Sequence, residues 1–180
     1  MNTEVDRVLA FGRKWRMRRH QEPTFLFVDL AGYTALTESR GDEVAVELAR
    51  RFRRTMRALS RKYGAWQVKS MGDGVMIWSP DAAQAVDLAA HTVRDVGTRA
   101  DLLPVRVGVH TGPAVMDGMD WYGGTVNVAA RLADEAEPNQ ALISAATLSA
   151  AMGELTRPPK VRRELVLRGV ERPIVAWRLT

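Results

Sequence analysis

The sequence predicts a single α+β domain of the ferredoxin-like type: a βαββαβ sheet with helices on one face and further strands appended at the C-terminal end. The chain has 180 residues, of which 46% are hydrophobic, and this is enough for one sizeable core. Short strand-like apolar runs alternate with longer stretches of helical spacing, in the order strand, helix, hairpin, helix, strand. We expect the domain to occupy residues 24–180, after a basic segment at residues 1–23.

The first strand and the long helix after it follow from the spacing of apolar residues. The run Phe25–Val28 ends at Asp29 and the turn Ala31–Gly32, which indicates a buried strand that enters a loop. The next segment has apolar residues at steps of three or four, the spacing of one buried helix face: Val44, Leu48, Phe52, Met56, Leu59 and Tyr63. Another face carries four arginines that we expect to be solvated: Arg50, Arg54, Arg57 and Arg61.

The remaining elements follow from turn residues and local composition. The tight turn Gly72-Asp73-Gly74 predicts a hairpin between strands at residues 65–71 and 75–78. Farther along, apolar spacing and helix-forming residues predict helices at 82–96, 125–135 and 145–152 and strands at 105–109, 141–144, 161–167 and 174–179.

Charge and composition restrict the kinds of partner and cofactor. Lys and Arg number 26 and Asp and Glu 21, and the resulting charge of +5 suits anionic partners such as nucleotides, nucleic acid or acidic lipid. The absence of cysteine excludes disulfides, thiol catalysis and Cys-ligated metals, and three scattered histidines argue against a His-based metal site. Any metal would therefore need oxygen ligands.

We expect a cytoplasmic protein, because the longest apolar runs are far below the roughly 20 residues that span a bilayer and the amino terminus has no secretion signal. Residues 1–23 carry six basic and three acidic side chains. We interpret them as a solvated lead-in helix closed by Pro23; a lipid- or partner-binding segment is the alternative.

Two aspartates are predicted to converge at one edge of the sheet. Asp29 lies where the first strand meets a loop, and Asp73 lies at the tip of the hairpin expected beside it. Paired carboxylates at strand ends suit Mg²⁺ or Mn²⁺ when a triphosphate supplies the other oxygen ligands. Gly32 lets backbone amides approach an anion, and the following helix offers its positive N-terminus. Each aspartate also has a plainer interpretation, as a helix N-cap for Asp29 and as a turn residue for Asp73.

Two further pairs of side chains suit a nucleotide. Lys69 donates and Asp120 accepts, which matches the ring nitrogen and the exocyclic amino group of adenine rather than the edge of guanine. Asn127 and Arg131 lie four residues apart on a predicted helix and share one face. An amide there could orient a ribose and a guanidinium could stabilise charge on a phosphorus centre, although such a pair taken alone is usually found at a surface.

Four segments together resemble the class III adenylyl and guanylyl cyclases, over the chain from Thr24 to the C-terminus. Residues 27–34 resemble the first metal motif of that family, and residues 69–73 resemble the second. Residues 106–113 match the strand that leads into its dimerisation arm, and residues 125–131 match its catalytic helix. Only Ala114–Met119 separate Pro113 from Asp120, so the arm is shorter than in many members.

The resemblance implies a reaction and a role for each of six residues. Asp29 and Asp73 would bind two divalent cations, Mg²⁺ or Mn²⁺. Lys69 and Asp120 would select adenine. Asn127 would position the ribose, and Arg131 would stabilise the transition state. The enzyme would be an adenylate cyclase, a lyase in which the 3′-hydroxyl of ATP attacks the α-phosphate to give 3′,5′-cyclic AMP and pyrophosphate. In this family the metal aspartates come from one subunit and the other four residues from its partner, so a homodimer would carry two composite sites.

Four more residues are implied in substrate binding. Gly32, Tyr33 and Thr34 follow the family pattern in the first loop, although Tyr33 and Thr34 also suit packing and capping. Arg168, in Leu167-Arg168-Gly169, resembles the cation of a leucine-lysine-glycine turn that reaches the terminal phosphates; a solvated turn is the alternative. His110 is interpreted as structural.

Other functions share parts of this pattern. A guanylate or pyrimidine nucleotide cyclase would use the same fold. A catalytically silent nucleotide-binding regulatory module would be expected to lack a metal aspartate or Arg131, and this sequence has both aspartates and the arginine. An RNA-binding domain is disfavoured because Ser70 and Gly72 stand where such domains place aromatic side chains. The Gly-Gly-Asp/Glu-Glu-Phe hairpin of diguanylate cyclases is absent. We expect no nucleic-acid partner.

Overall fold

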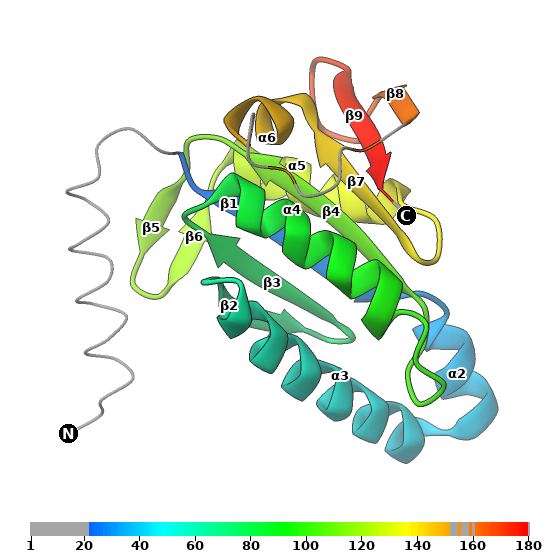
Figure 1. Ribbon diagram of the computed structural model, residues 1–180. Coiled ribbons are helices and arrows are strands. Elements are labelled where there is room, and N and C mark those ends of the chain that lie inside the picture. The colour runs from blue at the N-terminus through cyan, green and yellow to red at the C-terminus, as the bar shows by residue number, and fades with distance from the viewer. Residues whose placement is uncertain (1–21, 152–154, 156–158, 160, 180) are drawn as a thin grey trace, which may run out of the picture.

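The computed structural model describes residues 22–151, 155, 159 and 161–179. They form a mixed α+β domain around one seven-stranded sheet (Figure 1). The strands of this sheet are β1 (Thr24–Leu30), β2 (Trp66–Met71), β3 (Gly74–Ser79), β4 (Val105–Thr111), β7 (Gln140–Ser144), β8 (Val161–Leu165) and β9 (Ile174–Leu179).

The strand order is β2-β3-β1-β4-β7-β9-β8, and every pair is antiparallel except β4 with β7. The first four positions are those of a βαββαβ ferredoxin-like sheet, and the last three strands are appended to it. The predicted fold class is therefore confirmed.

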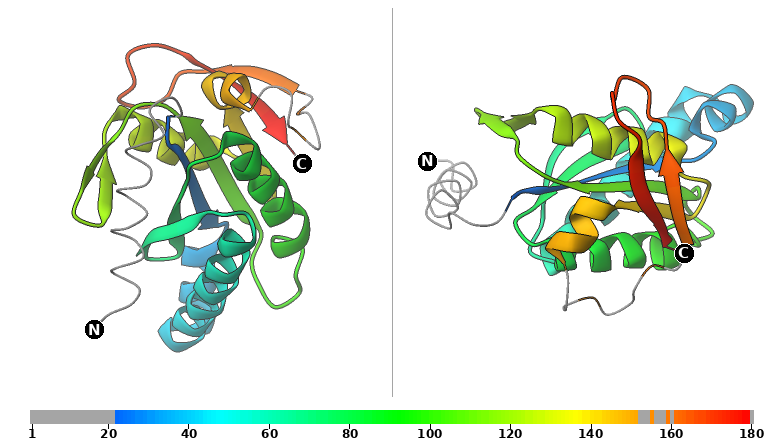
Figure 2. Two further views of the ribbon diagram at one scale, coloured as in Figure 1. Left: turned by 60° about the vertical axis from the view of Figure 1, so that its left-hand side comes forward. Right: turned by 90° about the horizontal axis from the view of Figure 1, so that it is seen from above.

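Helices cover both faces of the sheet. Helices α3 (Asp42–Lys62) and α4 (Ala82–His91) belong to the βαββαβ unit and lie on one face of the sheet, as predicted. Helix α5 (Gly124–Glu135) follows that unit and packs on the other face (Figures 1 and 2). The shorter helices are α2 (Tyr33–Arg40) and α6 (Ala145–Ala150). Helix α4 continues into a π-helical turn at Thr92–Val96, where the sequence predicted one uninterrupted helix.

Strand β1 lies at the centre of the sheet and contributes to both cores. Leu26, Val28 and Leu30 belong to the core beneath α3 and α4, whereas Phe25 and Phe27 belong to the core beneath α5. This division follows from the alternation of side chains along a strand. Because both faces are covered, packing on both sides anchors the end of β1 that carries Asp29.

The buried face of α3 differs from the predicted one in its first turn. Phe52, Met56 and Leu59 are buried as expected, but Ala45 is buried in place of Val44, which is 48% exposed. The helix begins after Gly41, whose φ of 84° separates α3 from α2, and the two helices pack against each other. Apolar spacing alone therefore chose the wrong position for the buried side chain in the first turn of α3.

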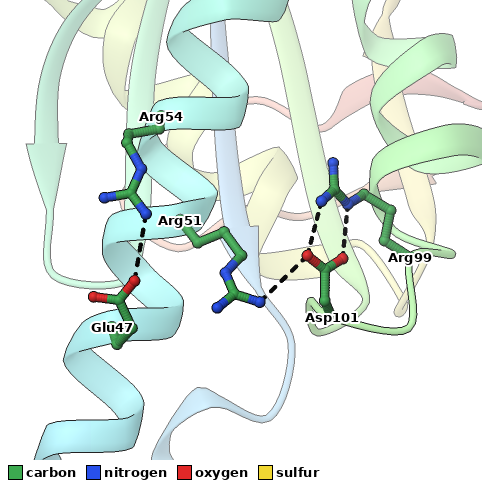
Figure 3. A network of polar contacts seen from close by, with 5 residues as sticks. All are labelled: Glu47, Arg51, Arg54, Arg99 and Asp101. Carbon is green, nitrogen blue, oxygen red and sulfur yellow. Dashed lines mark hydrogen bonds and ion pairs between the residues drawn. The ribbon is translucent and has the colours of Figure 1, made fainter.

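The four arginines predicted to form a solvated face of α3 are exposed, as expected. Figure 3 shows how neighbouring guanidinium groups on this helix are neutralised: Arg54 pairs with Glu47, and Arg51 pairs with Asp101, which also binds Arg99. Such exposed pairs contribute little stability.

A two-stranded arm projects from the sheet between β4 and α5 (Figures 1 and 2). It consists of β5 (Val115–Asp117) and β6 (Asp120–Tyr122), in which Val115 pairs with Tyr122 and Asp117 with Asp120. Strands of three residues are too short for their alternation to be recognised in a sequence. The arm nevertheless positions Asp120 beside β2.

The lead-in helix predicted within residues 1–23 lies outside the described residues, apart from Glu22 and Pro23. In the part of the chain that the structure does describe, no helix has the length and apolar character needed to cross a bilayer.

Candidate active site

The structure brings the two predicted metal aspartates together. Strands β1 and β3 are antiparallel neighbours with Val28 opposite Val75, so Asp29 lies next to the turn that carries Asp73. The approach is close, since a Cβ atom added to Gly74 would lie 3.2 Å from the Val28 carbonyl oxygen and 3.5 Å from Oδ1 of Asp29. Gly74 therefore allows the hairpin tip to approach the Asp29 carboxylate.

The Asp29 carboxylate affects the protonation of Asp73. The pKa of Asp73 is raised above its ordinary value of 3.8, first because the group is partly buried and second because Asp29 is negatively charged, and the protonated form of Asp73 can also donate a hydrogen bond to Asp29. Arg106 and a backbone hydrogen bond act in the opposite direction. A cation bound between the carboxylates would remove this repulsion.

Arg106 is a site residue that the sequence reasoning missed. It lies directly opposite Asp29 in the pairing of β1 with β4, and its Nη2 donates a hydrogen bond to Oδ2 of Asp29. The N-cap of α2 is Gly32, and no side chain caps this helix, so the N-cap interpretation of Asp29 is wrong. Only the strand register could have revealed Arg106, because 77 residues separate the two partners in the sequence.

The donor set fits a hard divalent cation. Asp29 and Asp73 supply carboxylate oxygens, which Mg²⁺ and Mn²⁺ prefer. Among the described residues there is no group of three or more His, Cys, Asp or Glu side chains that could hold a metal. The remaining ligands would therefore come from substrate oxygens and water.

Lys69 and Asp120, the pair predicted to select adenine, lie together between β2 and the arm. Lys69 Nζ lies 2.6 Å from Oδ2 of Asp120, and Oδ1 accepts a hydrogen bond of 2.8 Å from the backbone N–H of Trp121. The hydrogen bond from Lys69 is the main reason that the pKa of Asp120 is lowered. The Lys69 ammonium also lies 5.8 Å from the ring centroid of Tyr122, a neighbour that sequence reasoning missed although it shares a strand face with Asp120.

Asn127 and Arg131 are exposed on α5 and share a face, as predicted. Arg131 forms an ion pair of 2.9 Å with Asp134 on the same helix. Among the described residues, no recorded contact joins Asn127 or Arg131 to Asp29 or Asp73. A single chain therefore does not show one site that contains all six residues.

The remaining predicted residues have varied environments. Gly32 has a φ of 84° at the start of α2, Tyr33 packs partly against the core, and Thr34 is exposed. Arg168 is exposed in the turn before Gly169, whose φ is 77°. The packing of Tyr33 agrees with the plainer interpretation of that side chain.

His110 has a structural environment. Its Nδ1 lies 2.7 Å from Oγ of Ser144, which joins β4 to the end of β7. Burial lowers the pKa of His110 from 6.5 to about 4, so the ring is neutral at neutral pH.

Comparison with protein families identifies the family of the domain. Residues 15–179 match the adenylate and guanylate cyclase catalytic domain. The chain belongs to this family. The resemblance found in the sequence motifs is thereby confirmed, and the domain is a class III nucleotidyl cyclase domain.

Similar proteins include named adenylate cyclases. A pH-sensitive adenylate cyclase of Mycobacterium tuberculosis is 36% identical over 124 residues, which cover 69% of this chain and 31% of that protein. An adenylate cyclase of Streptomyces griseus is 31% identical over 126 residues, which cover 70% of this chain and 32% of that protein. The chain thus spans about a third of the length of these curated relatives.

Solved structures agree with the fold. A Trypanosoma brucei adenylate cyclase in its monomeric state has a TM-score of 0.77 and 26% identity, with 89% of this chain and 88% of that chain covered. The guanylate cyclase domain of a Catenaria anguillulae protein has a TM-score of 0.74 at 18% identity, with 89% and 97% covered, and shows the shared fold alone.

Proposed function

We propose that this cyclase domain converts ATP to 3′,5′-cyclic AMP and pyrophosphate at two composite sites of a homodimer. Membership of the cyclase family supports the reaction class. The proposal that ATP is the substrate depends on one observation, the contact of 2.6 Å between Lys69 and Asp120.

The contact supports adenine because it fixes a donor beside an acceptor. Lys69 can donate to the N1 atom of adenine while Asp120 accepts from the exocyclic amino group. Guanine presents a carbonyl oxygen and an N–H group in the reverse order, so a fixed pair would leave desolvated groups unpaired, at about 1 to 3 kcal/mol each. The Trp121 amide supports this fixed order by holding the second oxygen of Asp120.

Asp29 and Asp73 are the residues that would hold two divalent cations, Mg²⁺ or Mn²⁺. When bound, such ions neutralise phosphate charge and acidify an attacking hydroxyl. Arg106 keeps the Asp29 carboxylate in place, and the turn around Gly72 presents Asp73. In the reaction the 3′-oxygen forms a bond to the α-phosphorus, the bond from that phosphorus to the bridging oxygen breaks, pyrophosphate leaves, and the hydroxyl proton is released.

The other predicted residues would act from the neighbouring subunit or around the phosphates. Asn127 would orient the ribose, and Arg131 would leave Asp134 to stabilise charge on the transferred phosphorus. Gly32, Tyr33 and Thr34 would line the triphosphate at the start of α2, where no side chain caps the backbone amides. Arg168 would contact the terminal phosphates.

An exposed apolar surface supports the homodimer. Large hydrophobic side chains on the arm and at the end of β2 are exposed, next to Lys69 and Asp120: Met71, Val115, Met116, Met119 and Tyr122. A second copy that covered this surface would bring its own α5 and base-reading pair to the metal aspartates of the first. The arm is short, so we expect the dimer to depend on protein concentration.

The test is chromatographic analysis of products after incubation with ATP, GTP, CTP and UTP separately, in Mg²⁺, in Mn²⁺ and in EDTA. We expect metal-dependent cyclic AMP from ATP. A cyclic product from another nucleotide only would overturn the base assignment and leave the reaction class intact. A dimer that gives no product with any nucleotide would indicate a silent regulatory module.

A further inference from the structure

The tip of the β2–β3 hairpin is weakly held by the sheet. Ser70, Met71 and Gly72 are exposed, and Met71 opposite Gly74 is the last pair of the ladder. Gly72 has a φ of 60°, a conformation that favours glycine. Asp73 follows directly in this turn, so its position depends on whatever fixes the tip.

Arg53 of α3 reaches this tip from outside the sheet. Its Nη1 donates a hydrogen bond of 3.0 Å to the carbonyl oxygen of Gly72, the residue immediately before Asp73. The adjacent residue, Phe52, is fully buried, and Met56 one turn later is also fully buried, so the backbone of Arg53 is anchored in the core. A guanidinium extended from a rigid helix can therefore restrain the hairpin.

The other arginines in this region have different partners. Arg51 and Arg54 pair with the carboxylates of Asp101 and Glu47 (Figure 3), whereas Arg53 binds a main-chain carbonyl. The guanidinium that lowers the pKa of Asp73 is Arg106, not Arg53. Arg53 therefore affects where the hairpin tip lies and not the pKa of the Asp73 carboxylate.

We propose that Arg53 is a positioning residue for the metal ligand Asp73, through its hydrogen bond to the Gly72 carbonyl. The proposal rests on the proposed function, in which Asp29 and Asp73 hold divalent cations. Without this bond the tip would sample conformations in which Asp73 is turned away from Asp29, and cation binding would have to select the competent one. Arg53 would then affect metal affinity more than the rate at saturating metal.

The test compares Arg53→Met and Arg53→Lys with the matched control Arg54→Met, an arginine-to-methionine change at the next position of the same helix. Hydrogen–deuterium exchange of the amides of residues 70–75 is measured on metal-free protein. Mn²⁺ binding is measured by calorimetry in the presence of 3′-deoxy-ATP, which lacks the attacking hydroxyl. The dependence of turnover on Mn²⁺ separates the activation constant from kcat.

For Arg53→Met we expect faster exchange at the tip and Mn²⁺ binding weaker by about three- to tenfold, the effect of one exposed hydrogen bond of ordinary strength. The kcat at saturating Mn²⁺ should change by less than about twofold, because the same competent state is reached once metal is bound. Arg53→Lys, which keeps a donor, should recover part of the affinity, and Arg54→Met should match the wild type.

Equal exchange and equal Mn²⁺ affinity in Arg53→Met and Arg54→Met would overturn the proposal. A lower kcat with an unchanged activation constant would also overturn it, since this would make Arg53 a substrate contact. If Arg53→Met does not fold, Arg53→Lys takes its place with a smaller expected effect: exchange and Mn²⁺ affinity between those of the wild type and the loss predicted for Arg53→Met, and values equal to those of Arg54→Met would overturn the proposal. Failure of the wild type to bind Mn²⁺ would instead contradict the proposed function, and the exchange measurement would still decide whether Arg53 holds the tip.

Discussion

Acidification should destabilise the domain through His110. In the folded protein burial lowers the pKa of this histidine from 6.5 to about 4, whereas in the unfolded chain the ring is solvated and takes up a proton near its ordinary pKa. The unfolded state therefore binds more protons between these two values. The stability that comes from the neutral buried ring is complete above about pH 6.5 and is lost progressively as the pH falls towards 4.

The magnitude follows from the two pKa values. Between pH 8 and pH 5 the free energy of unfolding falls by about 2 kcal/mol because of His110. Below pH 4 this loss of stability reaches its maximum, about 3 kcal/mol. The carboxylates Asp101 and Asp120 have lowered pKa values and lose their stabilising charge below their ordinary pKa of 3.8, outside the main part of this range. The pKa of Asp73 is raised, so protonation of Asp73 acts in the opposite direction.

The assay is urea unfolding at pH 8, 6.5 and 5 for the wild type and His110→Gln. The variant should be less stable at pH 8, because the contact with Ser144 is changed, but its stability should fall by about 2 kcal/mol less than that of the wild type between pH 8 and 5. His91→Gln, on α4, is the matched control for loss of a histidine elsewhere. Parallel stability profiles for the wild type and His110→Gln would refute the reasoning from burial.

Four further predictions concern the active site. Asp73→Asn should keep the unfolding midpoint but lower metal-dependent turnover by more than about 100-fold, because it removes a direct metal ligand; a loss of less than tenfold would contradict the metal model. Mn²⁺ affinity measured by calorimetry should fall progressively as the pH is lowered from 7 to 4, because proton and metal compete for the Asp73 carboxylate, whose pKa is raised; an affinity that does not change over this range would count against it. Lys69→Glu combined with Asp120→Ser should shift the ratio of kcat/KM values towards GTP by at least about tenfold, and an unchanged ratio would refute the base assignment. Mixing the inactive variants Asp73→Asn and Arg131→Ala should restore about a quarter of wild-type turnover, because half of the dimers are mixed and each mixed dimer has one intact site; no recovery despite subunit exchange would exclude composite sites.

Much of the architecture was already determined by the sequence. The helical spacing from Phe52 to Leu59 and the turn at Gly72–Gly74 are local signals, and each of them gave the element that the structure contains. The order of elements then fixed the ferredoxin-like class, because short connections leave few ways to pair the strands. The convergence of Asp29 and Asp73 followed from that topology, whereas Lys69 and Asp120 were paired in the prediction by their chemistry and not by their place in the fold.

Only the tertiary structure decided which residues meet across long sequence distances. The pairing of Arg106 with Asp29 depends on the register of β1 and β4, and the bond from Arg53 to Gly72 depends on how α3 crosses the hairpin. The burial of Ala45 in place of Val44 likewise depends on tertiary packing that apolar spacing does not show. Local spacing specifies elements and their apolar faces, whereas register and packing are set by the whole core at once, so these contacts leave no signal in any single segment.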